Sequence, residues 1–249
     1  MLEILFLGTS CAIPTLENGS TSFLVRTSDY LILVDASDNP VKSILKAGMD
    51  PLELDVVLLT HYHADHLSGY PALISTLNCM GREKDLTVIT NAATESKAKD
   101  ILAIFKLQNN NLNYKVNYTD GLLEAALRVE LVSGFHTVPT SMVFFKENST
   151  VVFYTADTVY TPQISEIAKN CSLMIHEATY SRRRKDKLEG HSTAYDAGLS
   201  AENAGAKGLY LCHICLNEYP NLKSVIKEAR ETYTGEIIIP KLFHWYKVH

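Results

Sequence analysis

Residues 61–66 read His-Tyr-His-Ala-Asp-His, so three histidines and one aspartate fall within six positions. The apolar, β-branched run directly before them predicts a strand that ends where the cluster begins. Alternate residues of an extended segment point the same way, so we expect His61, His63 and Asp65 to share one side. His66 then opens a helical pattern. Imidazole nitrogens and carboxylate oxygens are zinc ligands, so the cluster predicts a metal site rather than a polar turn with coincidental histidines.

Three more candidate ligands occur singly, and alone each of them could equally be structural. His136 lies in the segment Gly-Phe-His-Thr-Val-Pro-Thr, Asp157 follows the apolar run Val151–Thr155, and His213 follows the run Leu209–Cys212. Side chains at strand ends are held by rigid elements and can meet at one edge of a sheet. A carboxylate has two oxygens, so Asp157 could bridge two cations.

The elements that must position these residues extend along the whole chain, without a Pro-, Gly- or Ser-rich linker. We therefore expect one α/β domain over residues 1–249. Early strands follow one another as in antiparallel meanders, whereas later strands alternate with helices. Thr94 and Thr193 are candidate helix N-caps. The expected strands are Leu2–Leu7, Ser22–Arg26, Leu31–Val34, Val56–Thr60, Leu86–Ile89, Met142–Phe145, Val151–Thr155, Leu173–His176, Leu209–Cys212 and Glu236–Ile239, and the expected helices are Asn39–Ala47, Leu67–Leu77, Thr94–Phe105, Pro162–Lys169, Ala194–Ala204 and Leu222–Thr232.

Composition argues against several classes of protein. A net charge of −5 argues against nonspecific coating of nucleic acid. The chain lacks a run of about 18 apolar residues, so we expect no membrane span and no membrane partner. Residues 1–8 lack a basic region and are typical of a first strand rather than a signal peptide. The odd, scattered set of cysteines predicts reduced thiols and a cytoplasmic location; it comprises Cys11, Cys79, Cys171, Cys212 and Cys215.

The order of these motifs resembles the metallo-β-lactamase superfamily, whose signature is His-x-His-x-Asp-His after a strand. Leu7–Ser10 is similar to the opening turn of that family, and Ile32–Ala36 to its second motif, an apolar strand followed by Asp. The resemblance implies an αββα sandwich, in which two mixed β-sheets pack face to face and helices cover their outer faces. It also implies two divalent metal ions, Zn²⁺ in the first place with Mn²⁺ or Fe²⁺ as alternatives. The first ion would take His61, His63 and His136, the second Asp65, His66 and His213, and both would share Asp157.

Two further motifs resemble those of ribonuclease Z, the phosphodiesterase side of the superfamily. Leu173–Tyr180 contains His-Glu-Ala-Thr, and Gly190–Ala194 contains His-Ser-Thr. The resemblance implies that His191 donates a proton to the leaving alkoxide and that Glu177 orients His191 and raises its pKa. Asp65 would take up a proton from the attacking water. The structural alternatives are a cap or ion pair for Glu177 and a neighbour of a helix N-cap for His191.

A run of positive charge begins between these two motifs with Arg182, Arg183 and Arg184. Such a run is often only a solvated loop. Its position between Glu177 and His191 leads us to expect that these arginines contact substrate phosphates.

The chain departs from the tRNA-processing pattern in several places. Only twenty residues separate His136 from Asp157, which leaves no room there for the arm that grips tRNA. Residues 14–19 lack the basic residues of the family, residues 216–219 lack its Arg-Tyr pair, and Ala156 replaces a glycine. We therefore expect a phosphodiester substrate that is a small molecule or an RNA end, and by analogy a homodimer.

Two other functional classes stay open. A thioester or lactam hydrolase similar to glyoxalase II would share the first motif but not the motifs around Glu177 and His191. A non-catalytic domain that binds RNA or a partner would require loss of activity, although every expected ligand is present. Oxygen-reducing diiron members of the superfamily carry Glu where His63 stands here.

Overall fold

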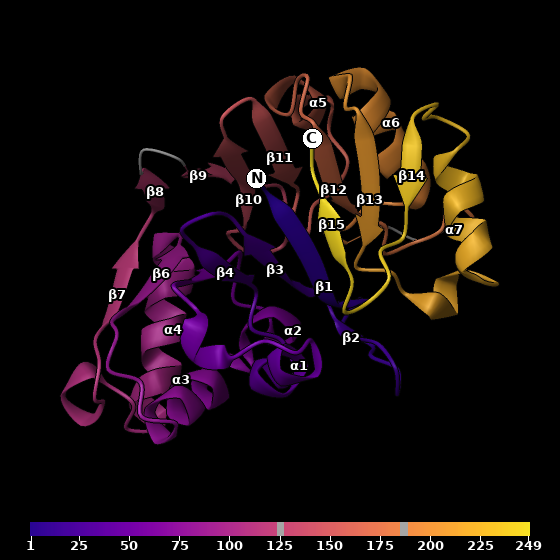
Figure 1. The fold of residues 1–249 in the computed structure, drawn as a ribbon. Helices are drawn as coiled ribbons and strands as arrows, with labels where there is room; N and C mark the ends of the chain where they lie inside the picture. Colours follow the sequence, from indigo (N-terminus) through magenta and orange to yellow (C-terminus); the bar gives the residue numbers. More distant parts are fainter. Residues whose placement is uncertain (124–126, 185–188) are drawn as a thin grey trace.

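In the computed structural model, which describes residues 1–123, 127–184 and 189–249, two β-sheets pack face to face between two layers of helices (Figure 1). The predicted αββα sandwich with mixed sheets is confirmed.

The first sheet has the strand order β15-β1-β3-β4-β5-β6-β7, with the short β2 beside β1. Its β1, β3 and β4 pair antiparallel, as the meander pattern predicts, whereas β4 to β7 run parallel. The strand bounds are β1 Glu3–Ser10, β2 Gly19–Ser20, β3 Ser22–Arg26, β4 Leu31–Val34, β5 Val56–Leu59, β6 Leu86–Thr90, β7 Val116–Thr119 and β15 Trp245–Lys247.

The second sheet has the order β14-β13-β12-β11-β10-β9-β8. Strands β8 to β11 pair antiparallel, and β11 to β14 run parallel. The strand bounds are β8 Gly121–Leu123, β9 Arg128–Ser133, β10 Ser141–Glu147, β11 Thr150–Tyr154, β12 Leu173–Glu177, β13 Gly208–Cys212 and β14 Glu236–Ile238.

Helices cover the outer face of each sheet (Figure 1). The first sheet is covered by α1 Pro40–Lys46, α2 Ala64–Leu67, α3 Tyr70–Cys79 and α4 Ala92–Ile104. The second is covered by α5 Pro162–Ile167, α6 Ala194–Ala204 and α7 Leu222–Ala229. Short 3₁₀ turns at Pro51–Glu53, Asn109–Asn111 and Leu216–Glu218 complete the helical segments of the described residues.

Three hydrophobic cores separate the four layers, and β1 shows how the sequence specifies them. Successive side chains of a strand point to opposite faces. Ile4 and Phe6 therefore join the core between the sheets, whereas Leu5 and Leu7 join the core under α1 to α4. Because both faces of β1 are buried, its sequence is a continuous apolar run rather than an alternating one.

The structure differs from the expected helices in two places. The helix expected over Leu67–Leu77 is two helices, α2 and α3, because the chain turns at Gly69. A Cβ on Gly69 would lie 2.8 Å from the Ala36 carbonyl oxygen, so the close approach of the two backbones requires glycine. The predicted cap Thr94 is wrong: the N-cap of α4 is Asn91, whose side chain accepts from the Thr94 N–H.

The predicted cap Thr193 is confirmed. Its hydroxyl accepts from the Asp196 N–H, and Asp196 accepts from the Thr193 N–H in return, which forms a capping box. Strands β2, β7, β8, β9 and β15 were not predicted, because they are short or carry charged residues that mask the pattern.

The prediction that all cysteines are reduced is wrong for one pair. Cys11, just after β1, and Cys215, shortly after β13, form a disulfide that joins the two sheets. The partners are 204 residues apart in sequence, so only the fold reveals that they meet. Cys79, Cys171 and Cys212 are free.

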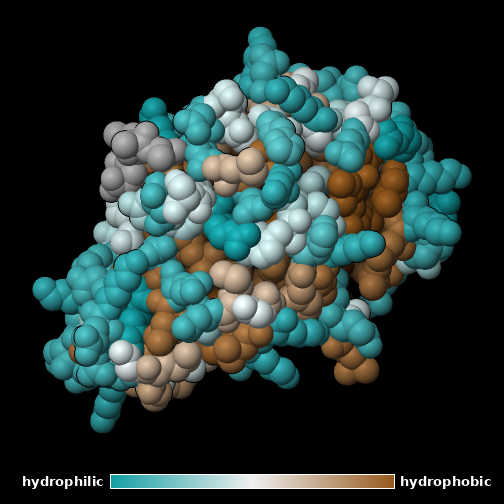
Figure 2. Space-filling model, in the orientation of Figure 1, coloured by the Kyte–Doolittle hydropathy of each residue, from teal (hydrophilic) through white to brown (hydrophobic). Residues whose placement is uncertain are grey.

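Figure 2 shows that polar side chains cover most of the face seen in Figure 1, with brown apolar surface at the right and in the lower middle of the view. Within the described residues, every helix is too short or too polar to span a bilayer.

The core between the sheets yields a prediction for stability. Phe23 is fully buried there, with its ring centroid 5.1 Å from that of Phe6 and 5.0 Å from that of Tyr154. We expect Phe23→Ala to lower the free energy of unfolding by about 3–5 kcal/mol, through lost burial and a cavity. Phe105→Ala is the matched control, because Phe105 is 59% exposed, and it should cost less than about 0.5 kcal/mol. Urea denaturation measures both; equal losses in the two variants would contradict this assignment of the core.

Candidate metal centre

The carboxyl ends of several strands bring the candidate residues together at one edge of the sandwich. β11, β12 and β13 run parallel, and β9 points the same way as β11 because both pair antiparallel with β10. Parallel strands present their carboxyl ends at a common edge, where ligands of α/β proteins typically bind. At this edge the Ser141 N–H donates to the Thr60 carbonyl oxygen at 3.0 Å, which ties the end of β5 to the second sheet.

The first group of donors consists of His61, His63, His136 and Asp157. His63 Nδ1 lies 3.1 Å from His61 Nε2 and 3.0 Å from His136 Nε2. Asp157 Oδ2 lies 3.7 Å from His61 Nε2 and 4.0 Å from His136 Nε2. Three imidazoles and one carboxylate oxygen around one point form a donor set that suits a divalent transition metal.

The second group consists of Asp65, His66, His213 and again Asp157. Asp157 Oδ2 lies 3.2 Å from His213 Nε2 and 3.3 Å from His66 Nε2, and Asp65 Oδ2 lies 3.2 Å from His213 Nε2. The structure thus brings together all seven residues singled out in the sequence, with Asp157 common to both groups. It does so differently from the extended segment that we expected, because Asp65 and His66 lie in α2 and only His61 and His63 precede the helix.

Four of the imidazoles are oriented by an acceptor on the nitrogen that points away from the donor groups. His66 Nδ1–H donates to Asp35 Oδ2 at 2.8 Å, and His136 Nδ1–H donates to the Gly190 carbonyl oxygen at 2.6 Å. His61 donates in the same way to the Thr60 hydroxyl at 3.0 Å, and His213 to the Thr179 hydroxyl at 2.8 Å. Such partners fix the tautomer that leaves the inward nitrogen free for a cation.

Buried atoms without partners support the fit to a metal. Among the described residues, His66 Nε2 and Asp157 Oδ1 have no hydrogen-bond partner although both are buried. Leaving buried polar atoms unpaired is costly, and native structures rarely do so without an unseen partner. The donor chemistry and these unpaired atoms therefore both fit one cation in each of the two donor groups.

The charge states of three of the histidines agree with this fit. Burial lowers the pKa of His61, His63 and His136, because a buried imidazole favours its neutral form, the form that binds metals. Burial alone would lower the pKa of His66 too, but the carboxylates of Asp157 and Asp35 outweigh it and raise that pKa. Burial would raise the pKa of Asp157, yet the neighbouring His213 and His66 hold it well below its usual value.

One of the candidate ligands and two residues beside the site have an unusual backbone conformation. Asp35, Ala156 and His213 adopt left-handed conformations with φ of 56°, 50° and 51°. Such conformations cost roughly 1–3 kcal/mol each for residues other than glycine and cluster at functional sites. The φ of Ala156 explains why the family pattern has glycine at this position.

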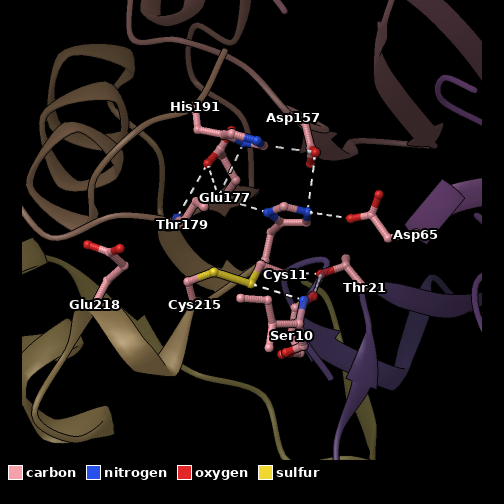
Figure 3. The surroundings of a disulfide bond; sticks show 12 residues. Ser10, Cys11, Thr21, Asp65, Asp157, Glu177, Thr179, His191, Cys215 and Glu218 are labelled. Carbon is pink, nitrogen blue, oxygen red and sulfur yellow. Dashed lines mark hydrogen bonds and ion pairs between the residues drawn. A yellow bond between two sulfur atoms is a disulfide. The ribbon is translucent and has the colours of Figure 1, made fainter. Parts of the chain in front are cut away.

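A second cluster, made of Glu177, His191 and Thr179, lies beside Asp157 (Figure 3). His191 Nδ1–H donates to Glu177 Oε1 at 3.0 Å, and the Thr179 hydroxyl donates to Glu177 Oε2. Burial alone would lower the pKa of His191, but the charge and hydrogen bond of Glu177 outweigh it and raise that pKa to about 9. Glu177 thus pairs with His191 and fixes the direction of its ring.

Glu177 is itself held in place by backbone donors. The N–H groups of Thr158 and Ser192 donate to its two oxygens at 2.7 and 3.1 Å. Although burial would raise the pKa of Glu177, the neighbouring His191 lowers it, so the carboxylate stays charged inside the protein.

A cavity of about 400 Å³ opens onto residues of the two donor groups and onto His191 and Thr179 of the Glu177 cluster. Asp65, His63, Asp157, His191 and His213 line one part of it. The remaining wall consists of Ala64, Thr179, Tyr180 and the segment Cys11, Ala12 and Ile13 together with Cys215. The volume is that of a site for a small ligand or for the end of a larger one.

The three arginines lie to the side of this cavity and do not line it. Arg182 forms an ion pair with Glu231, and Arg184 forms one with Glu218 at 2.6 Å. Arg184 also packs over the ring of Tyr180, 4.1 Å from its centroid, and Tyr180 does line the cavity. Arg183 is exposed and has no ion-pair partner among the described residues, which exclude 185–188.

A family model described as a beta-lactamase superfamily domain matches residues 30–214. The chain belongs to the metallo-β-lactamase superfamily. The resemblance inferred from the motifs is confirmed, and the match includes every one of the seven candidate metal ligands.

Individual relatives agree with this assignment. The chain is 26% identical to a ribonuclease Z of Haloarcula marismortui, over 96% of this chain and 94% of the relative. Their alignment spans 294 positions, whereas this chain has 249 residues, so the relative carries insertions that this chain lacks. Two solved structures share the fold. The metallo-β-lactamase fold protein YhfI of Bacillus subtilis has a TM-score of 0.84 and 24% identity, and the match covers 98% of each chain. A diphosphatase of the PhnP family has a TM-score of 0.78 and 17% identity, and the match covers 100% of this chain and 98% of the diphosphatase.

Sequence reasoning missed the residues that orient the histidines. Thr60, Thr179 and the Gly190 carbonyl each accept from a candidate ligand, yet the motifs alone assign them no role. Gly190 could have been noticed in the sequence as a glycine directly before His191. In the structure its φ is 74°, and a Cβ there would lie 2.6 Å from His136 Nδ1. The apolar and sulfur wall of the cavity gave no recognisable signal.

Asp35 provides a test of the orienting contacts, since it also accepts from the Thr60 N–H at 2.8 Å. We expect Asp35→Asn to weaken zinc binding about 10- to 100-fold, because His66 loses its charged acceptor. Asp38→Asn is a matched control, because Asp38 also has a positive φ but accepts from the Ser20 N–H instead. Competition with a chelator of known affinity measures both variants; equal affinities for Asp35→Asn and wild type would contradict the role of Asp35.

Proposed function

We propose that this protein is a dinuclear metal-dependent phosphodiesterase of the ribonuclease Z-like branch. The observation that carries the proposal is the pair of donor groups joined by Asp157, next to the Glu177–His191 pair in one cavity. The names of the matched relatives, ribonuclease Z and a diphosphatase, support cleavage of a phosphate ester or anhydride.

Zinc is the first choice for both ions, because histidines dominate the donors, with Mn²⁺ or Fe²⁺ as alternatives. His61, His63 and His136 would hold one ion, Asp65, His66 and His213 the other, and Asp157 both. When bound, such ions would polarise a phosphate and lower the pKa of a coordinated water toward about 7.

The protein's own residues supply the proton transfers. His191 faces the cavity while Glu177 fixes its ring, so it is placed to protonate the leaving alkoxide. Asp65 lines the same cavity and keeps its side chain 14% exposed, so it can accept a proton from the attacking water. Glu177 does not face the cavity; it acts through His191 as a positioning residue.

The substrate class follows from the cavity and its surroundings. Between His136 and Asp157 the chain forms only the β10–β11 hairpin, with a two-residue turn at Asn148 and Ser149. This supports a small or cyclic phosphodiester, or a protruding RNA end, rather than a large RNA body gripped by an arm. Residues 1–249 would act as one hydrolase domain. The homodimer and the cytoplasmic location stay predictions.

The proposal predicts hydrolysis of a simple phosphodiester. Zinc-loaded protein should cleave bis-p-nitrophenyl phosphate, and His191→Ala should lower kcat about 100- to 10,000-fold, because the leaving group loses its proton donor. His63→Ala should lose both metal and activity. His244→Ala is the control, because the ring of His244 contacts Tyr246 and does not line the cavity, and it should keep wild-type kcat.

A substrate panel separates the proposal from its alternatives. It contains 2′,3′- and 3′,5′-cyclic nucleotides, a tRNA precursor, a thioester and a lactam. Cleavage of the thioester or lactam without any phosphodiester would favour the glyoxalase II-like alternative. Less than one metal ion per chain and no turnover of any substrate would favour the non-catalytic domain.

Substrate contact by Arg182, Arg183 and Arg184 is the second part of the proposal. Replacing all three by alanine should raise KM for a phosphodiester about tenfold and leave kcat within about twofold, because cationic side chains beside the cavity attract phosphates. Arg128→Ala is the control, since Arg128 also pairs with a glutamate, on β9. An unchanged KM in the triple variant would refute this role.

A further inference from the structure

The Cys11–Cys215 disulfide forms part of the wall of the cavity that contains the candidate metal ligands. Both cysteines line this cavity together with His63, Asp65 and His191. Figure 3 shows the disulfide between the end of β1 at Ser10 and the group formed by Asp65, Asp157, Glu177 and His191. The two cysteines and Asp157 therefore line the same cavity.

The disulfide joins two segments that are otherwise connected by backbone hydrogen bonds. The Ile214 N–H donates to the Thr9 carbonyl oxygen at 2.9 Å, and the Cys11 N–H donates to the Ile214 carbonyl oxygen at 3.3 Å. On the other side, the Cys215 N–H donates to the Thr179 carbonyl oxygen at 3.3 Å. The covalent bond thus fixes the start of the segment after β1 against the residues that orient His213.

The segment that starts at Cys11 carries the apolar part of the wall. Ala12 and Ile13 line the cavity, and Ile13 is 55% exposed. Few contacts hold them: the Ser10 hydroxyl donates to the Ile13 carbonyl oxygen at 2.7 Å, and the Ile13 N–H donates to Cys11 Sγ at 3.4 Å. Since Ala12 and Ile13 are exposed and contribute little burial of their own, the disulfide adds a covalent restraint on this wall to these hydrogen bonds.

We propose that the Cys11–Cys215 disulfide is a redox-controlled wall of the substrate cavity, closed in the oxidised protein and released by a dithiol reductant. The proposal rests on the proposed function, because it assumes that the cavity binds the phosphodiester. In the oxidised protein, Ala12 and Ile13 would pack against the organic group of the bound substrate. Once the disulfide is reduced, they can move away from that group, so substrate binding weakens while the metal ligands stay in place.

The redox step is an ordinary thiol–disulfide exchange. A thiolate of the dithiol attacks Cys215 Sγ, since Cys215 is 8% exposed and Cys11 only 2%. The S–S bond breaks, the Cys11 sulfur leaves and takes up a proton, and a mixed disulfide forms. The second thiol of the reductant then displaces Cys215, which also becomes a thiol while the reductant becomes a cyclic disulfide. Two electrons and two protons are transferred in all.

The metal ligands are expected to stay in place because His213 has other anchors. Its N–H donates to the Thr21 hydroxyl at 3.0 Å, and its ring donates to Thr179. Neither contact involves the disulfide. Reduction should therefore affect KM and leave metal content unchanged, whereas a purely structural cross-link would affect melting temperature alone.

The test compares oxidised and reduced protein, both loaded with zinc. The reductant is tris(2-carboxyethyl)phosphine, because a dithiol would also bind zinc. Thiol titration of the unfolded protein should rise from the three free cysteines, Cys79, Cys171 and Cys212, to all five. On reduction, KM for bis-p-nitrophenyl phosphate should rise about three- to tenfold, since the substrate must now order the wall itself, with kcat within about twofold. Zinc per chain should not change.

Cysteine variants distinguish the effect of reducing this disulfide from any effect of the reductant on the free cysteines. The double variant Cys11→Ser with Cys215→Ser should show the high KM without reductant and no response to it. Cys79→Ser is the control, because Cys79 is a free, exposed thiol at the end of α3, and it should respond like wild type.

Three results would overturn the proposal: an unchanged KM after complete reduction, a loss of zinc that parallels the loss of activity, or five free thiols in the protein before reduction. If the oxidised protein cleaves no phosphodiester, the proposed function fails, and calorimetric binding of the same diester decides the redox proposal. A three- to tenfold weaker binding after reduction would then support it, and equal or absent binding would overturn it.

Discussion

The buried carboxylate of Asp157 lies within 4.0 Å of five imidazoles, those of His61, His66, His136, His191 and His213. Burial of so many polar groups is costly unless their charges and lone pairs are satisfied. The outer nitrogens of these rings have acceptors, whereas the inner atoms face one another and leave Asp157 Oδ1 and His66 Nε2 unpaired. A pair of cations is the simplest way to satisfy this arrangement, and the rest of the structure serves to maintain it.

The sandwich maintains it through the ends of strands from both sheets. The core between the sheets fixes β5 relative to β11 and β13, so residues that are up to 152 positions apart, such as His61 and His213, occupy one edge. Hydrogen bonds across this edge, from Ser141 to Thr60 and from Ile214 to Thr9, add direct links between the sheets. Left-handed residues such as Ala156 turn the chain out of its strand and place Asp157 between the histidines.

Local sequence patterns were enough for much of this account. The His-x-His-x-Asp-His cluster, the buried strands and the Thr193 cap each depend on neighbouring residues, and their order along the chain resembles that of a known superfamily. The helix that carries Asp65 was missed because a four-residue helix has too short a pattern. The disulfide, the ion pair between Arg184 and Glu218 and the acceptors of the histidines connect residues distant in sequence, so no local pattern could reveal them.

X-ray diffraction from crystals of the zinc-loaded protein shows whether two cations bind beside Asp157, as we propose. Anomalous difference maps recorded above and below the zinc absorption edge locate the ions without any assumption about activity. We expect two peaks, one among His61, His63 and His136 and one among Asp65, His66 and His213. A single peak, or peaks away from Asp157, would contradict this proposal.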